Sequence, residues 1–314
     1  MRTLRSVTSM SLYKLADVLV RRVALICAAA LLFVACAPKT SDTIGGETQW
    51  IDVAGGRLKT QVFAHVSDGR RPILILILHG DIPNPRPDYQ YLFAKLLVEG
   101  IPGSPERSAL LKAALGSGWD EKNIVAAGIL RPGYADPSGD RSSGDMGKAV
   151  GDNYTPEVID AVAAAARELA AKYDASAVVL VGHSGGGAIV ANLLGRHPDL
   201  ADAALLVACG CDPQAWRARM RAQQPGPLWE EPISSLMPLS LVDAVARDTR
   251  VRLLAGENDD VILPQDIRRY AAALRDRGID VQLTVAPGLG HNILMSPEAF
   301  RELGLLVEAL GDVD

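Results

Sequence analysis

Cysteine, positive charge and long hydrophobic runs are all scarce in this sequence of 314 residues, and each shortage excludes a class of protein. With only four cysteines, the chain gives little indication of a disulfide-stabilised scaffold. Residues 1–35 hold five of the 32 basic residues and one of the 37 acidic ones, which leaves 27 basic and 36 acidic residues and a net charge of −9 for the rest of the chain. A body with that charge repels a phosphate backbone, so no nucleic acid is expected as a partner.

Signatures of cofactors and metals are missing as well. Residues 182–187 are rich in glycine, but they carry a serine and lack the lysine of a phosphate-binding loop, and no dinucleotide fingerprint is present. A loop rich in aspartate follows Arg131, but its spacing matches no calcium-binding loop, and we interpret it as a solvated, mobile segment near the entrance of a site. Its acidic residues are Asp136, Asp140, Asp145 and Asp152. We therefore expect neither a cofactor nor a metal ion.

The N-terminal stretch has the pattern of an export signal. Arg21 and Arg22 precede an apolar run, residues 23–35, which is shorter than the roughly 18 residues of a membrane-spanning helix. Small residues end the run, and a polar stretch follows. This combination predicts a secretory signal over residues 1–35.

Residues 33–36 (FVAC) resemble a bacterial lipobox, although Phe33 stands where leucine is usual. The resemblance implies that Cys36 receives a lipid, becomes the new N-terminus and attaches the protein to a membrane. A plain cleaved signal and an uncleaved anchor are the alternatives, and all three export the protein. Ala37, in place of the aspartate that retains related lipoproteins at the inner membrane, favours the outer membrane. The expected location is the bacterial cell envelope, in the periplasm or at the outer membrane.

Beyond a linker at 36–48, short apolar runs alternate with helical patterns, which predicts one domain over residues 49–314 with a mostly parallel sheet covered by helices on both faces. Thr155 and Pro156 are typical of a helix N-cap and first position. Residues 212–247 break the alternation, and we expect a small cap there. The expected strands are 50–54, 58–66, 72–79, 123–129, 177–182, 202–208, 250–255 and 279–286, and the expected helices are 88–98, 105–116, 156–172, 186–196, 264–277 and 297–310.

Cys209 and Cys211 stand one residue apart at the end of the expected strand 202–208. Export would permit a disulfide between them. We interpret them instead as two small hydrophobic residues beside the core.

A candidate nucleophile lies in residues 182–186 (GHSGG), which match G-x-S-x-G between an apolar strand and a helical pattern. In such a turn the serine hydroxyl is exposed, and the N–H groups at the start of the following helix favour a developing negative charge. We predict that Ser184 is the nucleophile. His183 points elsewhere in a turn of this type, so we interpret it as structural.

A candidate acid and base follow the last two expected strands. Residues 256–260 (GENDD) come after strand 250–255, and His291 comes after strand 279–286. The carboxyl ends of parallel strands share one edge of the sheet, which is where ligands bind. A serine needs a base, and a histidine held by a carboxylate is suited to that role. His65 and His197 follow no late strand, so we predict that His291 is the base.

The order serine, acid, histidine, with His79-Gly80 after the third strand, resembles the α/β-hydrolase family from about residue 50 to the end. The resemblance implies an α/β-hydrolase fold with about eight strands. It selects Asp259 as the acid by its spacing from Gly256, with Asp260 and Glu257 as alternatives.

The resemblance also implies an oxyanion hole formed by the N–H of Gly185 and that of Asp81 or Ile82, of which we choose Asp81. A carboxylate there would repel an oxyanion, so the Asp81 side chain is expected to turn away to a backbone or basic partner. Arg131 could pair with Asp81 or contact the substrate, but we interpret it as a structural loop residue. His79 is expected to be a hydrogen-bonding residue under this loop.

Acyl transfer without a cofactor is the activity that the resemblance implies. The favoured hypothesis is hydrolysis of a small carboxylic ester, thioester or lactone. The alternatives are a serine peptidase or amidase acting on a peptide-like substrate, and a non-catalytic surface lipoprotein that uses the fold for binding. The segment before the hydrolase is too short for a propeller, so the large oligopeptidase type is not expected. The sequence predicts no oligomeric state.

Overall fold

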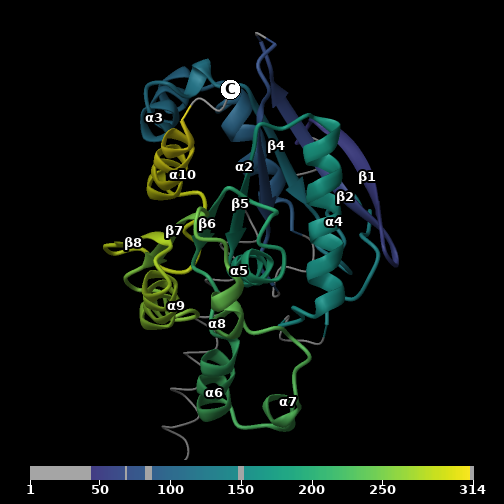
Figure 1. Cartoon of the computed structure of the whole chain (residues 1–314), viewed down its shortest axis with the longest axis vertical. Helices are drawn as coiled ribbons and strands as arrows, with labels where there is room; N and C mark the ends of the chain where they lie inside the picture. Colours follow the sequence, from purple (N-terminus) through teal and green to yellow (C-terminus); the bar gives the residue numbers. More distant parts are fainter. Residues whose placement is uncertain (1–43, 68, 82–86, 148–151, 312–314) are drawn as a thin grey trace, which may run out of the picture. The chain divides into compact units, whose positions relative to one another are not determined.

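The computed structural model describes residues 44–67, 69–81, 87–147 and 152–311 (Figure 1). The signal over 1–35, the lipidation site Cys36, the linker up to residue 43 and Ile82 lie outside the described residues. The remainder of the expected linker differs from the prediction, because β1 already begins at Glu47. Among the described residues, no helix combines the length and the apolar character that crossing a membrane requires.

A single eight-stranded sheet organises the described chain, in the order β1-β2-β4-β3-β5-β6-β7-β8. The pairs β1–β2 and β2–β4 are antiparallel, and the other pairs are parallel. The strands are β1 (Glu47–Val53), β2 (Gly56–His65), β3 (Ile73–Leu78), β4 (Ile124–Ile129), β5 (Ala177–His183), β6 (Ala203–Val207), β7 (Arg250–Gly256) and β8 (Asp280–Ala286). The mostly parallel sheet expected from the sequence is confirmed, and the expected strand ends shift by three residues or fewer.

Helices cover both faces of the sheet (Figure 1). Leu74, Leu76 and Leu78 of β3 belong to one hydrophobic cluster with residues of α4, α5 and α9, and the intervening isoleucines of β3 belong to a second cluster with residues of α2, α3 and α10. Side chains alternate along a strand, so a run without polar residues must be buried on both sides. In the described chain the helices are α2 (Tyr89–Glu99), α3 (Pro105–Leu115), α4 (Pro156–Lys172), α5 (Gly185–Arg196), α6 (Pro213–Gln223), α7 (Pro227–Glu230), α8 (Pro238–Leu241), α9 (Pro264–Asp276) and α10 (Pro297–Leu310), with 3-10 turns at η1 (Trp119–Glu121) and η2 (Val242–Ala244).

The start of α4 follows the sequence signal. The Thr155 hydroxyl accepts a hydrogen bond from the backbone N–H of Val158 at 3.4 Å, and Pro156 occupies the first turn. A capping hydroxyl satisfies an amide that has no partner inside the helix, and proline costs nothing at a position whose N–H is not needed. The predicted N-cap is confirmed.

The segment between β6 and β7 is helical. It contains α6, α7 and α8, of which α8 packs on α5 and the first two extend away from the sheet (Figure 1). Arg217 of α6 is buried and donates hydrogen bonds to the backbone oxygens of Leu228 and Glu231, both at 2.9 Å. The rings of Trp216 and Trp229 meet edge to face with centroids 5.5 Å apart. These contacts hold α6 and α7 together as one unit.

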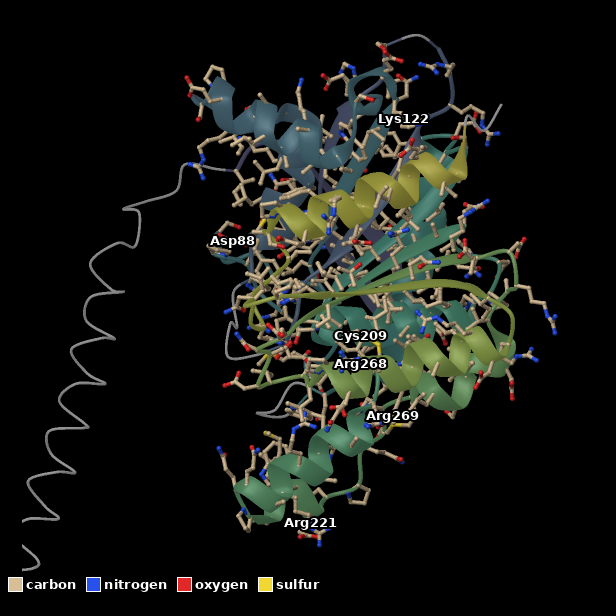
Figure 2. All side chains as sticks on the ribbon, turned by 90° about the vertical axis from the view of Figure 1, so that its left-hand side faces the viewer. Asp88, Lys122, Cys209, Arg221, Arg268 and Arg269 are labelled. Carbon is tan, nitrogen blue, oxygen red and sulfur yellow. A yellow bond between two sulfur atoms is a disulfide. The ribbon has the colours of Figure 1, made fainter. Side chains whose placement is uncertain are left out.

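Cys209 and Cys211 form a disulfide at the turn between β6 and α6 (Figure 2). Both side chains are fully buried beside the core, as expected, but the interpretation as unpaired hydrophobic residues is wrong. The backbone turns sharply here, with a φ of 46° at Ala208, and brings the two Cα atoms to 5.1 Å. That separation lies within the range that a disulfide spans.

Candidate active site

The turn at Ser184 joins the end of β5 to the start of α5. Ser184 has a φ of 55°, a conformation that is unfavourable for a residue with a side chain. The turn brings backbones into close contact, because a Cβ on Gly182 or on Gly186 would overlap a backbone oxygen. The two glycines therefore permit the turn, and the hydroxyl of Ser184 faces a cavity at the carboxyl edge of the sheet.

Ser184, His291 and Asp259 come together at this edge from three different strand ends. The Nε2 atom of His291 lies 3.0 Å from the Oγ atom of Ser184. Its Nδ1 atom lies 2.9 Å from one carboxylate oxygen of Asp259 and 3.1 Å from the other. With the ring neutral, Nδ1–H donates to Asp259 and Nε2 accepts from the serine hydroxyl. This arrangement can move a proton from the serine to the imidazole.

The loop after β7 fixes the Asp259 carboxylate. Asp259 is buried, and one of its oxygens accepts hydrogen bonds from the backbone N–H groups of Val261 at 3.0 Å and Ile262 at 2.8 Å. Neither of the two alternative acids bonds to His291. Glu257 accepts from the N–H of Gly288 at 2.9 Å, and the Asp260 side chain is exposed and has no hydrogen bond or ion pair within the described part of the chain.

His183 supports the loop that carries His291. The Nε2–H of His183 donates to the backbone oxygen of His291 at 3.0 Å, and its Nδ1 accepts from the hydroxyl of Tyr89 at 3.2 Å. Burial lowers the pKa of His183 to about 4, so the ring stays neutral and can make both bonds. The sequence indicated a structural histidine, but nothing in it indicated that Tyr89 and His291 would be the partners.

The loop after β3 lies against the nucleophile turn. A Cβ on Gly80 would lie 3.0 Å from the Cβ of Ser184, and the N–H of Gly80 donates to the hydroxyl of Tyr89. The backbone N–H groups of Asp81 and Gly185 have no acceptor among the described residues. These are the two donors predicted for an oxyanion hole, and their freedom is compatible with that role.

The Asp81 carboxylate has partners on both of its oxygens. The Nη1 atom of Arg131 lies 2.8 Å from one oxygen, and the hydroxyl of Tyr154 donates to the other at 2.6 Å. Tyr134 donates a weaker bond at 3.4 Å. The carboxylate thus has a basic partner, as expected for Asp81. The interpretation of Arg131 as a structural loop residue is incomplete, because its guanidinium forms an ion pair with Asp81, which was the alternative prediction.

His79 lies beneath the same loop. It is fully buried, its Nε2 accepts from the backbone N–H of Arg131 at 3.1 Å, and its Nδ1–H donates to the oxygen of Gly80 at 2.7 Å. Burial and the nearby Arg131 hold the pKa of His79 well below its usual value. His79 therefore acts as a neutral hydrogen-bonding residue, as expected.

The aspartate-rich loop after β4 is solvated only in part: residues 137–141 are exposed, as predicted, but some of its aspartates are engaged in ion pairs. Asp136 is buried and accepts from Lys59 of β2 at 2.6 Å, and Asp140 accepts from the same ammonium at 2.7 Å. Asp152 pairs with Arg217 of α6 at 2.6 Å. A buried lysine needs carboxylate partners, and nothing in the spacing of the aspartates indicated Lys59 as that partner.

A cavity of about 640 Å³ opens around Ser184 and His291. Its walls come from the loops after β3, β5, β6, β7 and β8, from the segment before α4, and from α2 and α6. Aromatic side chains are contributed by Tyr89, Tyr154 and Trp216. The sequence did not indicate that Tyr154 and Trp216 would line this cavity. Each follows a loop, and the periodicity of the sequence does not determine the path of a loop. Among the residues that the structure describes, no group of three or more His, Cys, Asp or Glu side chains is arranged to hold a metal ion.

The sequence model of the prolyl oligopeptidase family matches residues 138–305. Pyrococcus horikoshii acylaminoacyl peptidase is similar in structure, with a TM-score of 0.56 and 12% identity over 85% of this chain and 40% of its own. A prolyl endopeptidase has a TM-score of 0.59 and 18% identity over 85% of this chain and 39% of its own.

A smaller protein is also similar. Est1E from Butyrivibrio proteoclasticus has a TM-score of 0.53 and 14% identity over 84% of this chain and 100% of its own. No curated protein matches the sequence. The chain spans about two fifths of the length of the peptidases and the whole of Est1E. At these identities the likeness shows the fold alone, and it confirms the α/β-hydrolase fold.

Proposed function

This chain belongs to the prolyl oligopeptidase family and is a serine hydrolase, and from that premise we propose that it hydrolyses small carboxylic esters, including thioesters and lactones, through an acyl-enzyme on Ser184. One observation carries the acyl-enzyme part of the proposal: the continuous hydrogen-bonded series from Ser184 through His291 to Asp259, with distances of 3.0 and 2.9 Å. A free serine hydroxyl is a poor nucleophile, and this series supplies the base that activates it.

Each group has a defined part in the proposed reaction. Ser184 attacks the substrate carbonyl while the Nε2 atom of His291 takes its proton, and Asp259 stabilises the resulting imidazolium. The N–H groups of Gly185 and Asp81 stabilise the oxyanion of the tetrahedral intermediate. His291 then protonates the leaving alcohol, and it later deprotonates the water that releases the acid.

Peptide or amide bonds are the second candidate substrate, because the matching family is named for a peptidase. Est1E, which this chain covers in full, supports the ester proposal through its name alone. The same residues serve both reactions, since His291 can protonate an amine as readily as an alcohol. The two candidates therefore differ in the substrate and not in the roles of the site.

The test is the intact mass of the protein after treatment with a fluorophosphonate probe, with Ser184→Ala as the control. We expect one adduct on the wild type and none on the variant. A panel of p-nitrophenyl esters and aminoacyl p-nitroanilides then separates the candidates. Faster turnover of the anilides would favour the peptidase, and a folded wild type that forms no adduct would contradict both.

We also propose that the protein is exported and carries a lipid on Cys36. The support is the sequence of residues 21–36, with its basic pair, short apolar run and lipobox-like end. Fractionation of cells that express the wild type or Cys36→Ser tests this. The wild type is expected in the membrane fraction with the mass of a diacylglyceryl group on its N-terminal peptide, and the same distribution for both proteins would contradict the proposal.

A further inference from the structure

The position of Asp81 poses an electrostatic problem. Its backbone N–H is one of the two proposed oxyanion donors, yet its carboxylate packs against the other donor, because a Cβ on Gly185 would overlap the Asp81 carboxylate. Only 13% of the Asp81 side chain is exposed, so water screens its charge poorly. An uncompensated carboxylate at this point would repel the negative charge that forms on the substrate oxygen.

Two buried groups compensate and orient this carboxylate. Arg131, fully buried, lies 2.8 Å from one oxygen, and the Tyr154 hydroxyl donates to the other at 2.6 Å. Burial and the nearby Asp81 raise the pKa of Tyr154 well above its usual value, so the hydroxyl keeps the proton that it donates. Arg131 supplies the balancing charge, and Tyr154 fixes the direction of the carboxylate from the opposite side.

Tyr154 is itself held by the helical segment between β6 and β7. The backbone N–H of Tyr154 donates to the hydroxyl of Ser235 at 3.0 Å, and the backbone oxygen of Tyr154 accepts from the N–H of Leu236 at 2.8 Å. Two residues earlier, Asp152 pairs with Arg217 of α6 at 2.6 Å. The turn that carries Tyr154 is therefore bonded to the segment between β6 and β7 both at Tyr154 itself and at Asp152.

We propose that Tyr154 is a positioning residue for the hydrolytic reaction, which holds the Asp81 carboxylate against Arg131 so that the backbone N–H of Asp81 stays directed at the oxyanion. The proposal rests on the proposed function of Ser184. It gives the segment 213–236 a part in the reaction, because that segment fixes Tyr154. Tyr154 acts through Asp81 and not on the substrate itself.

The test is a double-mutant cycle with Tyr154→Phe and Asp81→Asn, measured as kcat and KM on p-nitrophenyl butyrate. Removing an oxyanion donor outright lowers kcat by about a hundredfold or more. Tyr154→Phe leaves the N–H of Asp81 in place but less well positioned, so we expect it to lower kcat about tenfold, with KM nearly unchanged. In the Asp81→Asn background the Tyr154 substitution is expected to have little further effect, because its partner has changed. Additive losses would show that the two side chains act on kcat independently of each other.

The matched control is Tyr270→Phe. Tyr270 is also fully buried, and its hydroxyl donates to the oxygen of Ala191 at 3.4 Å, away from the cavity. This variant is expected to retain the wild-type kcat. If Tyr154→Phe does not fold, Ser235→Ala removes the acceptor of the Tyr154 N–H and is expected to lower kcat several-fold. All rates are divided by the fraction of protein that the fluorophosphonate probe labels.

The outcomes separate the two proposals. A labelled, active wild type with an unchanged kcat in Tyr154→Phe, or with additive losses in the cycle, would overturn the positioning role alone. An equal loss in Tyr270→Phe would also overturn it. A wild type that neither takes the probe nor hydrolyses any substrate would overturn the proposed function and this role together.

Discussion

His183 is a buried histidine that, in its neutral form, holds His291, the proposed base, in place. Its neighbour His291 needs a fixed backbone position, and the Nε2–H of His183 supplies it through the bond of 3.0 Å to the backbone oxygen. Its pKa is lowered from 6.5 to about 4 by burial, so the unfolded chain binds a proton more readily than the folded one. The unfolding free energy that this group contributes is fully present above the pKa of 6.5 in the unfolded chain. It decreases as the pH falls from 6.5 toward about 4.

We therefore expect His183→Gln to flatten the dependence of stability on pH. Glutamine can still donate to the oxygen of His291, but it does not titrate. Between about pH 7.5 and about pH 4.5 the wild type should lose about 2 kcal/mol more unfolding free energy than the variant. Urea unfolding at both pH values measures this, with His65→Gln in an exposed position as the control. Parallel curves for the wild type and His183→Gln would contradict the role given to burial.

The sequence predicts individual site residues only where the chemistry and the strand ends limit the choice. Ser184, His291 and Asp259 each follow a strand that the sequence predicts, and the structure brings the three together. Their roles remain predictions until the probe is applied. Tyr154 lies just before a helix N-cap, and Tyr89 lies at the start of α2, so periodicity describes the helix beside each but not the loop contact that the ring makes.

The turn between β6 and α6 is an element that the disulfide shapes directly. Gly210, between the two cysteines, lines the cavity, and its N–H donates to the oxygen of Ser184 at 3.2 Å. A bridge that closes so short a loop restricts the unfolded chain little compared with one that closes a long loop. Its main effect is therefore on the folded turn, which passes from Gly210 through Cys211 to Asp212, the N-cap of α6.

Peptide mapping tests the state and the accessibility of this bridge. Without reductant, the peptide that contains Cys209 and Cys211 is expected to be two hydrogens lighter than its dithiol form. Because both side chains are fully buried, a reductant should open the bridge only slowly in the native protein and rapidly in urea. Alkylation of either cysteine in the native, unreduced protein would contradict the bridge.

Elements buried on both faces are the part of the fold that the sequence predicts best. The run of leucine and isoleucine in β3 admits few positions other than the centre of a sheet, and β3 lies between β4 and β5. The short helices α7 and α8 had no such pattern. They depend on contacts such as that of Arg217 with Leu228, which periodicity cannot indicate.

At the scale of the whole molecule, the charges around the cavity and the net charge of the chain affect which substrates can approach. The carboxylates of Asp81 and Asp152 each have an arginine partner, whereas the Asp260 side chain at the cavity wall has none among the described residues. The chain as a whole has a formal net charge of −5. A substrate with its own carboxylate would therefore approach against the field of the protein.

Neutral esters are accordingly expected to react faster than anionic ones. The ratio of kcat/KM for p-nitrophenyl butyrate to that for the monoester of succinic acid should fall by about a factor of two to five in Asp260→Asn, because an exposed charge is worth no more than about 1 kcal/mol. Asp280→Asn makes the same change of charge at the opposite edge of the sheet and should leave the ratio unchanged. Added salt should reduce the wild-type ratio. Equal ratios in the wild type and Asp260→Asn would contradict the prediction.

The residues of the candidate site are far apart along the chain, so the site can form only after its last residue has been synthesised. Ser184 and His291 are 107 residues apart, and His291 follows β8, an edge strand that pairs with β7. A chain that is still being synthesised can complete the turn at Ser184 before residue 291 has been made. A growing molecule therefore carries Ser184 without His291, and the proposed acyl transfer can start only when the last strand has joined the sheet.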